Sequence, residues 1–141
     1  MAGKKLTCLD CAQVNRVPEE RLMDAKCGTC GAKLISTKAV AVDFATLQKA
    51  AKNDELPLVV DFWAPWCGPC KMMGPEFSTG QAADVLAGKA RLVKLNTEDE
   101  PKAGQVYGIR GIPTMIRFDG GKEKKRQSGA MRAGEIVGWV G

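Results

Sequence analysis

The sequence predicts an α/β domain preceded by a short cysteine-rich segment. Strand-like apolar runs alternate with helix-like periodicity from Thr37 onward, which is typical of α/β architecture. The six cysteines form three C-x-x-C pairs, two of them within the first 30 residues. The length of 141 residues and the charged fraction of 26% fit a small globular protein. We therefore expect residues 1–35 to form an N-terminal segment and residues 36–141 to form the α/β domain.

The first half of the domain contains two predicted β-α units. Residues 38–42 are rich in β-branched side chains and predict a short strand, after which Asp43 can cap a helix. Phe44 and Leu47 recur in that helix at helical spacing. Residues 56–63 are almost continuously apolar, as expected of a strand that is covered on both faces. A second helix is expected after Cys70.

The second half predicts strand, helix, two strands and helix. A strand is expected at 91–95, followed by a helix at 100–107 with Pro101 in its first turn. Strands at 114–118 and 124–127 flank Asp119-Gly120-Gly121, which is a hairpin signal. A short helix at 134–140 closes the chain. The predicted order is thus β-α-β-α-β-α-β-β-α.

The four N-terminal cysteines indicate a metal site. They follow the spacing C-x2-C-x15-C-x2-C and are Cys8, Cys11, Cys27 and Cys30. This spacing lets two tight turns offer two sulfurs each to one tetrahedral ion. A segment of this size buries too little apolar surface to fold unaided, so the metal would supply most of its stability. We predict zinc, although four sulfurs also suit iron, and further redox pairs or a flexible thiol-rich tail are the alternatives.

The composition excludes several functions. The chain has no histidine, which rules out Cys-His and Ser-His nucleophile pairs. Its net charge of +5 includes a basic cluster at residues 122–126 beside a turn, where such charges are usually just solvated, so no nucleic-acid partner is expected. No apolar run approaches the ~18 residues that span a bilayer, and no signal-peptide pattern is present. We expect a cytoplasmic protein without a membrane partner.

The third cysteine pair is predicted to be redox-active. Cys67 and Cys70 lie where a buried strand becomes a helix, and the positive helix end favours a thiolate on Cys67. Cys70, one turn into the helix, is placed to attack a mixed disulfide and release the product. Pro69 holds the two sulfurs in a stiff turn. Half of a zinc site and a plain structural pair are the alternatives.

Two charged residues interrupt the predicted buried strands. Burial of Asp61 should raise the pKa of its carboxyl group, which could then accept the thiol proton of Cys70. Lys94 interrupts the neighbouring strand and could lie beside Asp61 as its charge partner. The alternative is that each side chain faces solvent at an edge.

Three segments closely resemble the thioredoxin family. They are Trp63 to Lys71 with its W-C-G-P-C motif, Val93 to Asn96, and Tyr107 to Thr114, in this order and spacing. The resemblance extends over residues 37–141, and the four-cysteine segment resembles that of the zinc-containing bacterial thioredoxin-2 type. It implies a thioredoxin fold, with a central mixed sheet flanked by helices, preceded by a small zinc ribbon.

The resemblance also implies an activity and a site. Protein disulfides would be reduced at Cys67 and Cys70, and an NADPH-dependent thioredoxin reductase would restore the dithiol without a bound organic cofactor. Asp61 and Lys94 match the family's buried carboxylate and the lysine near it, and the Ile112–Pro113 bond is expected to be cis. The implied substrate surface consists of Trp66, Gly68, Pro69, Ile112, Pro113, Gly129 and Ala130.

Other functions remain open at this point. A thioredoxin-like binding or holdase module would use the four-cysteine segment as its partner surface. A disulfide oxidase would need an oxidising compartment and a less reducing pair than Gly68-Pro69. The metal site itself could be a structural staple, a partner-binding module or a redox sensor.

Overall fold

The computed structural model describes residues 3–78 and 86–140. Within these ranges the predicted order of strands and helices is confirmed, and no helix is long and apolar enough to cross a membrane. Gly80, which the sequence pattern would place in the helix after Cys70, lies outside the described residues. The elements of the α/β domain are β3 (Val40–Ala41), α1 (Phe44–Asn53), β4 (Leu58–Trp63), α2 (Gly68–Ser78), β5 (Arg91–Asn96), α4 (Pro101–Val106), β6 (Thr114–Asp119), β7 (Lys122–Ser128) and α5 (Ala133–Val140).

The five strands form one mixed sheet in the order β3-β5-β4-β6-β7. β3, β5 and β4 are parallel, whereas β6 runs antiparallel to β4 and β7 antiparallel to β6. The central position of β4 explains its apolar sequence, because neighbouring strands occupy both edges and helices cover both faces. The register places Asp61 of β4 directly opposite Lys94 of β5.

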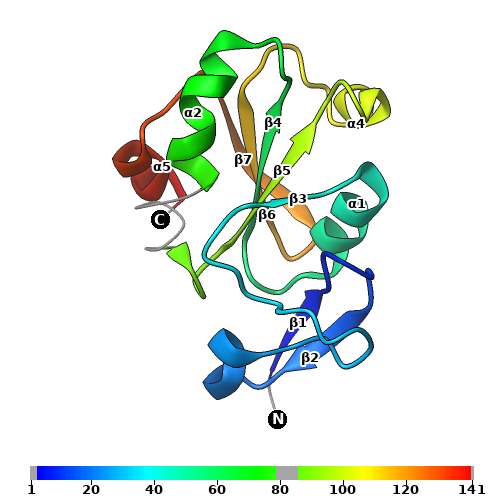
Figure 1. Cartoon of the computed structure of the whole chain (residues 1–141). Coiled ribbons are helices and arrows are strands. Elements are labelled where there is room, and N and C mark those ends of the chain that lie inside the picture. The colour runs from blue at the N-terminus through cyan, green and yellow to red at the C-terminus, as the bar shows by residue number, and fades with distance from the viewer. Residues whose placement is uncertain (1–2, 79–85, 141) are drawn as a thin grey trace.

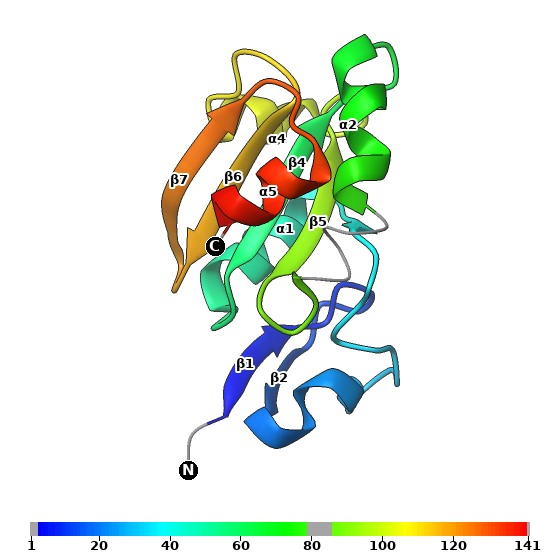
Figure 2. The same cartoon turned by 90° about the vertical axis from the view of Figure 1, so that its left-hand side faces the viewer.

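The helices cover the two faces of the sheet in pairs. α1 and α4 lie on one face, and α2 and α5 lie on the other (Figure 2). Because alternate side chains of a strand point to opposite faces, Val60 and Phe62 pack with the core on the α1 side, while Val59 packs with Met73 and Phe77 of α2. Asp61 therefore points to the same face as α2.

The two edge strands differ most in length from their predicted ranges. β3 spans two residues rather than 38–42, because Ser36 Oγ accepts a hydrogen bond from the N–H of Lys38 at 3.1 Å and holds the preceding chain in a local turn. β7 begins earlier than predicted, since Gly120 and Gly121 adopt φ values of +58° and +88° and connect β6 to β7 in only two residues.

The N-terminal segment is a small unit at one end of the sheet. Antiparallel strands β1 (Lys4–Thr7) and β2 (Val14–Val17) precede the 3₁₀ helix η1 (Glu19–Asp24). Figure 1 shows this unit next to the end of the sheet where β4 begins, whereas α2 starts at the opposite end. The four-cysteine segment and the Cys67–Cys70 pair thus lie at opposite ends of the sheet.

A buried ion pair joins the N-terminal segment to the α/β domain. Arg91 Nη1 donates to Asp54 Oδ2 at 2.6 Å and to the carbonyl oxygen of Thr7 at 2.8 Å. Asp54 Oδ1 accepts from the N–H of Thr7 at 2.7 Å, and all three residues are buried. Lys5 and Glu55 add two hydrogen bonds at 2.8 and 2.9 Å between the same segments. The backbone N–H and carbonyl oxygen of Thr7 are therefore both hydrogen-bonded to the Asp54–Arg91 ion pair.

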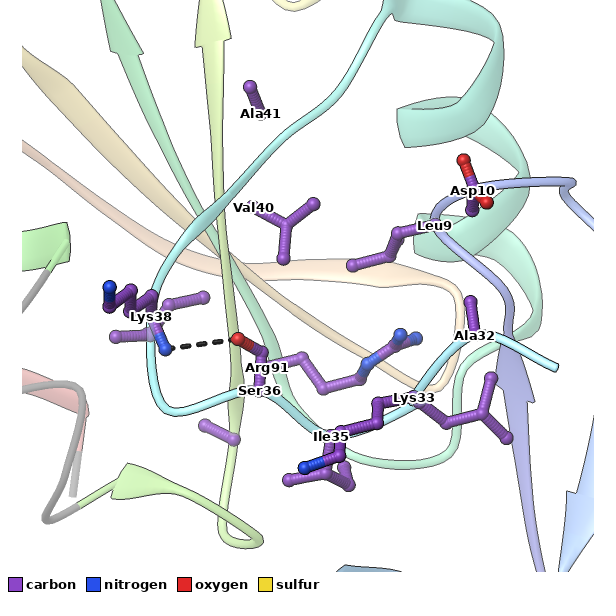
Figure 3. Close-up of a pocket in the computed structure, with 13 residues that line it drawn as sticks. Leu9, Asp10, Ala32, Lys33, Ile35, Ser36, Lys38, Val40, Ala41 and Arg91 are labelled. Atoms are coloured by element: carbon purple, nitrogen blue, oxygen red, sulfur yellow. Dashed lines mark hydrogen bonds between the residues drawn. The ribbon is translucent and has the colours of Figure 1, made fainter. Parts of the chain in front are cut away.

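A hollow of about 380 Å³ lies along the same junction (Figure 3). Leu9 of the N-terminal segment and Val40 of β3 point toward each other in this hollow, and the aliphatic part of Arg91 runs below them in the view. Leu9 also packs against the core on the α1 side of the sheet. The two parts of the chain thus share apolar contacts in addition to the ion pair.

Candidate functional site

Cys67 and Cys70 form a disulfide at the start of α2, with their Cα atoms 5.2 Å apart. α2 begins at Gly68, so Cys67 holds the position immediately before the helix. The N–H of Cys70 donates to Cys67 Sγ at 3.2 Å, as a backbone donor does to the side chain of a capping residue. Once the pair is reduced, this donor and the positive helix end both favour a thiolate at Cys67.

The two sulfurs face different surroundings. Cys67 lines an open groove of about 520 Å³ together with Trp66, Gly68, Pro69 and Ile112. The side chain of Trp66 is 69% exposed, which excludes a role in the core. Cys70 instead lines a separate hollow of about 430 Å³ that it shares with Asp61. Only Cys67 therefore opens onto the groove that a substrate could enter.

A loop with a cis peptide bond borders the disulfide. The Ile112–Pro113 bond is cis, as expected, and the carbonyl oxygen of Ile112 lies 3.7 Å from Cys67 Sγ. Gly129 has a φ of +101° and donates its N–H to the carbonyl oxygen of Pro113 at 2.9 Å. Gly129 and Ala130 are exposed beside this loop, but Ala130 lines a different hollow from the Cys67 groove.

Asp61 is buried beneath the disulfide. It is only 2% exposed, which excludes the alternative that it faces solvent at an edge. Burial raises the pKa of Asp61 to about 7, and the opposing attraction of Lys94 is smaller. Within the described ranges, Asp61 Oδ1 has no hydrogen-bond partner. Lys94 is partly buried and lines the same hollow as Asp61 and Cys70, so the structure brings these three predicted residues together.

The four N-terminal cysteines form one cluster. All four Sγ atoms lie within 4.8 Å of one another, and both the Cys8–Cys30 and Cys11–Cys27 pairs are 3.6 Å apart. Tetrahedral zinc with bonds of about 2.3 Å separates its sulfur ligands by roughly 3.8 Å. The cluster therefore has the dimensions of a four-sulfur metal site.

The pKa values of two of these thiols are shifted in opposite directions. The backbone N–H groups of Cys30 and Thr29 lower the pKa of Cys27 to about 6. Although the N–H of Ala32 acts in the other direction, burial and the neighbouring thiols raise the pKa of Cys30 to about 12. Four thiolates this close can coexist only with a cation among them. The donor set therefore fits a metal ion held by the four sulfurs.

The two cysteine turns reach the same backbone geometry from different sequences. Gly31 follows the second pair with a φ of +79°, and Ala12 takes the corresponding place after the first pair with a φ of +68°. A left-handed alanine is strained by about 1 kcal/mol relative to glycine. The missing glycine in the first turn therefore leaves its geometry unchanged.

Comparison with known proteins identifies the family. The family model described as Thioredoxin matches residues 37–141, three quarters of the chain. This chain belongs to the thioredoxin family. The model described as "Thioredoxin 2, N-terminal" matches residues 7–32, which contain the cysteine cluster, so this thioredoxin is of the type that carries an N-terminal zinc ribbon.

Individual relatives agree with this assignment. Thioredoxin C-3 of Corynebacterium nephridii is 35% identical over 138 residues, covering 96% of this chain and 92% of the relative. A thioredoxin of Synechocystis is 42% identical over 90 residues, covering 64% and 82%. The crystal structure of chloroplastic thioredoxin z superposes with a TM-score of 0.65 at 28% identity and covers 73% of this chain and 91% of its own.

The fold, the family and the cysteine geometry together define the activity. This thioredoxin is a thiol–disulfide oxidoreductase that reduces protein disulfides by dithiol–disulfide exchange at Cys67 and Cys70. The predicted substrate surface did not include five residues that line the groove, which are Thr97, Gly104, Ile109, Arg110 and Gly111. The last three of these belong to a segment that carried the resemblance, but Thr97 and Gly104 reach the groove only through the fold.

Proposed function

We propose that Cys67 is the attacking residue of this reductase. Its thiolate attacks one sulfur of a substrate disulfide, forms a mixed disulfide and releases the other substrate sulfur as a thiolate. The opening of Cys67 onto the 520 Å³ groove supports this role, because the substrate disulfide must approach from outside. Trp66, Gly68, Pro69, Ile112 and Pro113, with Gly129 and Ala130, would hold the extended substrate beside it.

Cys70 completes the reaction in the proposed mechanism. Its thiol transfers a proton to the carboxylate of Asp61, and the resulting thiolate attacks the Cys67 sulfur of the mixed disulfide. The second substrate thiolate leaves, and the Cys67–Cys70 disulfide remains. Cys70 and Asp61 line the same hollow, and a pKa of about 7 leaves Asp61 partly ionised at neutral pH and able to accept a proton. The positive charge of Lys94 moderates that pKa.

A partner must then return two electrons and two protons to the disulfide. We assign this step to an NADPH-dependent thioredoxin reductase, since the family is generally reduced in this way. We also propose that the protein works in the reducing cytoplasm. The chain is proposed to divide into an N-terminal segment of residues 1–35 and a thioredoxin domain of residues 36–141. The separate family matches at residues 7–32 and 37–141 support that division.

The metal in the N-terminal cluster is proposed to be zinc, held by Cys8, Cys11, Cys27 and Cys30. Such an ion supplies a closed four-sulfur staple for a segment with a very small core. We expect elemental analysis of the purified protein to find one zinc per chain, and chelation at neutral pH to unfold residues 3–36 as followed by NMR. Stoichiometric iron, or an N-terminal segment that keeps its spectrum without metal, would contradict the assignment.

The reductase mechanism is tested by insulin reduction driven by a small dithiol. We expect Cys67→Ser to abolish turnover, because the remaining Cys70 faces the inner hollow rather than the groove. Cys70→Ser should instead trap the mixed disulfide, visible as an added mass that a reductant removes. Lys49→Gln, an exposed change on α1, is the matched control and should match the wild type. Full activity of Cys67→Ser would refute the mechanism.

A further inference from the structure

A further hollow, of about 400 Å³, lies between α2 and the start of α5. Met72 of α2 lines one side, and Ala130 and Met131 line the other. Met72 follows Cys70 by two residues, while Ala130 follows Gly129, whose N–H bonds to the carbonyl oxygen of Pro113. Both sides are therefore formed by segments that lead directly into the redox site.

One large apolar side chain of this hollow is unusually exposed. Met72 is 68% exposed, and only Trp66, Met23 and Val106 are comparable large apolar residues in the described chain. Two of these four lie next to the redox cysteines in the chain, Trp66 directly before Cys67 and Met72 two residues after Cys70. Exposed apolar groups gathered at one place mark a binding surface, and methionine adapts its shape to varied partners.

Two carboxylates fix the wall of the hollow. Glu76 of α2 accepts a hydrogen bond from the N–H of Ala133 at 3.1 Å, and Glu135 accepts one from the N–H of Arg132 at 3.1 Å. The Glu76 bond joins α2 to the first residue of α5, and the Glu135 bond caps the start of α5 next to Met131. Arg132 also lines the hollow, but with two carboxylates against one cation its lining is net negative, so an acidic side chain is disfavoured there.

We propose that this hollow, defined by Met72, Ala130 and Met131, is a subsite for a large apolar side chain of the substrate. This apolar side chain belongs to the substrate residue two positions before or after the reactive cysteine, since residues i and i+2 of an extended chain point to the same side. The subsite deepens the proposed reductase function, on which it rests. It selects protein disulfides whose flanking sequence is apolar and not acidic.

The test compares cystine-bridged peptides that carry Leu, Asn or Glu either two residues before or two residues after the reactive cysteine. In at least one of the two series, the wild type should have a lower KM for Leu than for Asn, and the highest KM for Glu. In Met72→Gln/Met131→Gln the Leu-to-Asn preference should fall by roughly five- to tenfold, the effect of losing about 50 Å² of apolar burial. The kcat values should stay unchanged.

Matched measurements separate this proposal from the reductase function. Met23→Gln changes an exposed methionine of the N-terminal segment and should keep the wild-type preference. Oxidised glutathione, which has no apolar residue beside its cystine, should be reduced at the same rate by all three proteins. Equal rates would show that the variants are folded. If the wild type fails to reduce any disulfide, the reductase function is wrong. If it reduces them and the double variant keeps the Leu preference in both series, the subsite is refuted.

Discussion

Replacing Arg91 with Met is expected to lower the free energy of unfolding by about 3–5 kcal/mol, the usual effect of removing one partner from a buried ion pair. The change leaves the Asp54 carboxylate buried without a cation and removes the donor that bonds to the Thr7 carbonyl oxygen. Because Thr7 precedes Cys8 of the cysteine cluster, the N-terminal segment should also become sensitive to trypsin. Urea denaturation and limited proteolysis measure the two effects.

Two further variants test the physical cause. Arg91→Met combined with Asp54→Ala should lose less than the sum of the single changes, since no uncompensated charge remains buried. Lys4→Met breaks an exposed pair with Glu19 at 3.8 Å and should change stability by less than about 1 kcal/mol. Additive effects of Arg91→Met and Asp54→Ala would show that the two side chains are not coupled.

The second large effect is expected at Asp61. Its ordinary pKa is 3.8 and its pKa in the folded protein is about 7, so between these values the folded state binds the proton that the unfolded state has lost. The stability of the wild type should therefore fall as the pH rises from about 4 to about 7, and then stay level. Asp61→Asn removes this loss and should be more stable than the wild type above pH 7, by up to roughly 4 kcal/mol.

Urea denaturation of the oxidised protein between pH 4 and pH 9 measures this difference. The gap between Asp61→Asn and the wild type should be small at pH 4 and should open with rising pH. Glu98→Gln, which replaces an exposed carboxylate, should run parallel to the wild type. A constant gap between Asp61→Asn and the wild type at every pH would mean that the folded protein does not hold Asp61 protonated.

The sequence predicted the redox site well because the relevant residues are close together in the chain. The apolar run before Asp61, the turn at Cys67 and the helix after it are local patterns, and the four-cysteine spacing predicts a cysteine cluster almost by itself. The glycine hairpin after Asp119 was predicted for the same reason. Such patterns depend only on residues that are close in the chain, so they can be recognised without knowledge of the fold.

The ion pair between Asp54 and Arg91 was not predicted, because its partners are 37 residues apart and the local sequence around each is typical of a solvated charge. Asp54 follows a helix, where a charged residue is usually solvated, and Arg91 begins a strand. Only the docking of β1 against the sheet buries them together. The methionine hollow is similar, since Met72 and Met131 meet only after α5 packs against α2.

The two outer strands of the sheet bear on how the protein behaves when crowded with copies of itself. Open strand edges invite pairing between molecules, which leads to aggregation. Here β3 offers only two residues at one edge, and β7 carries Lys122, Lys124, Lys125 and Arg126 at the other. One edge is too short to serve as a template and the other repels a second copy. The two edge strands thus protect the fold against fibre formation, independently of the redox reaction of its cysteines.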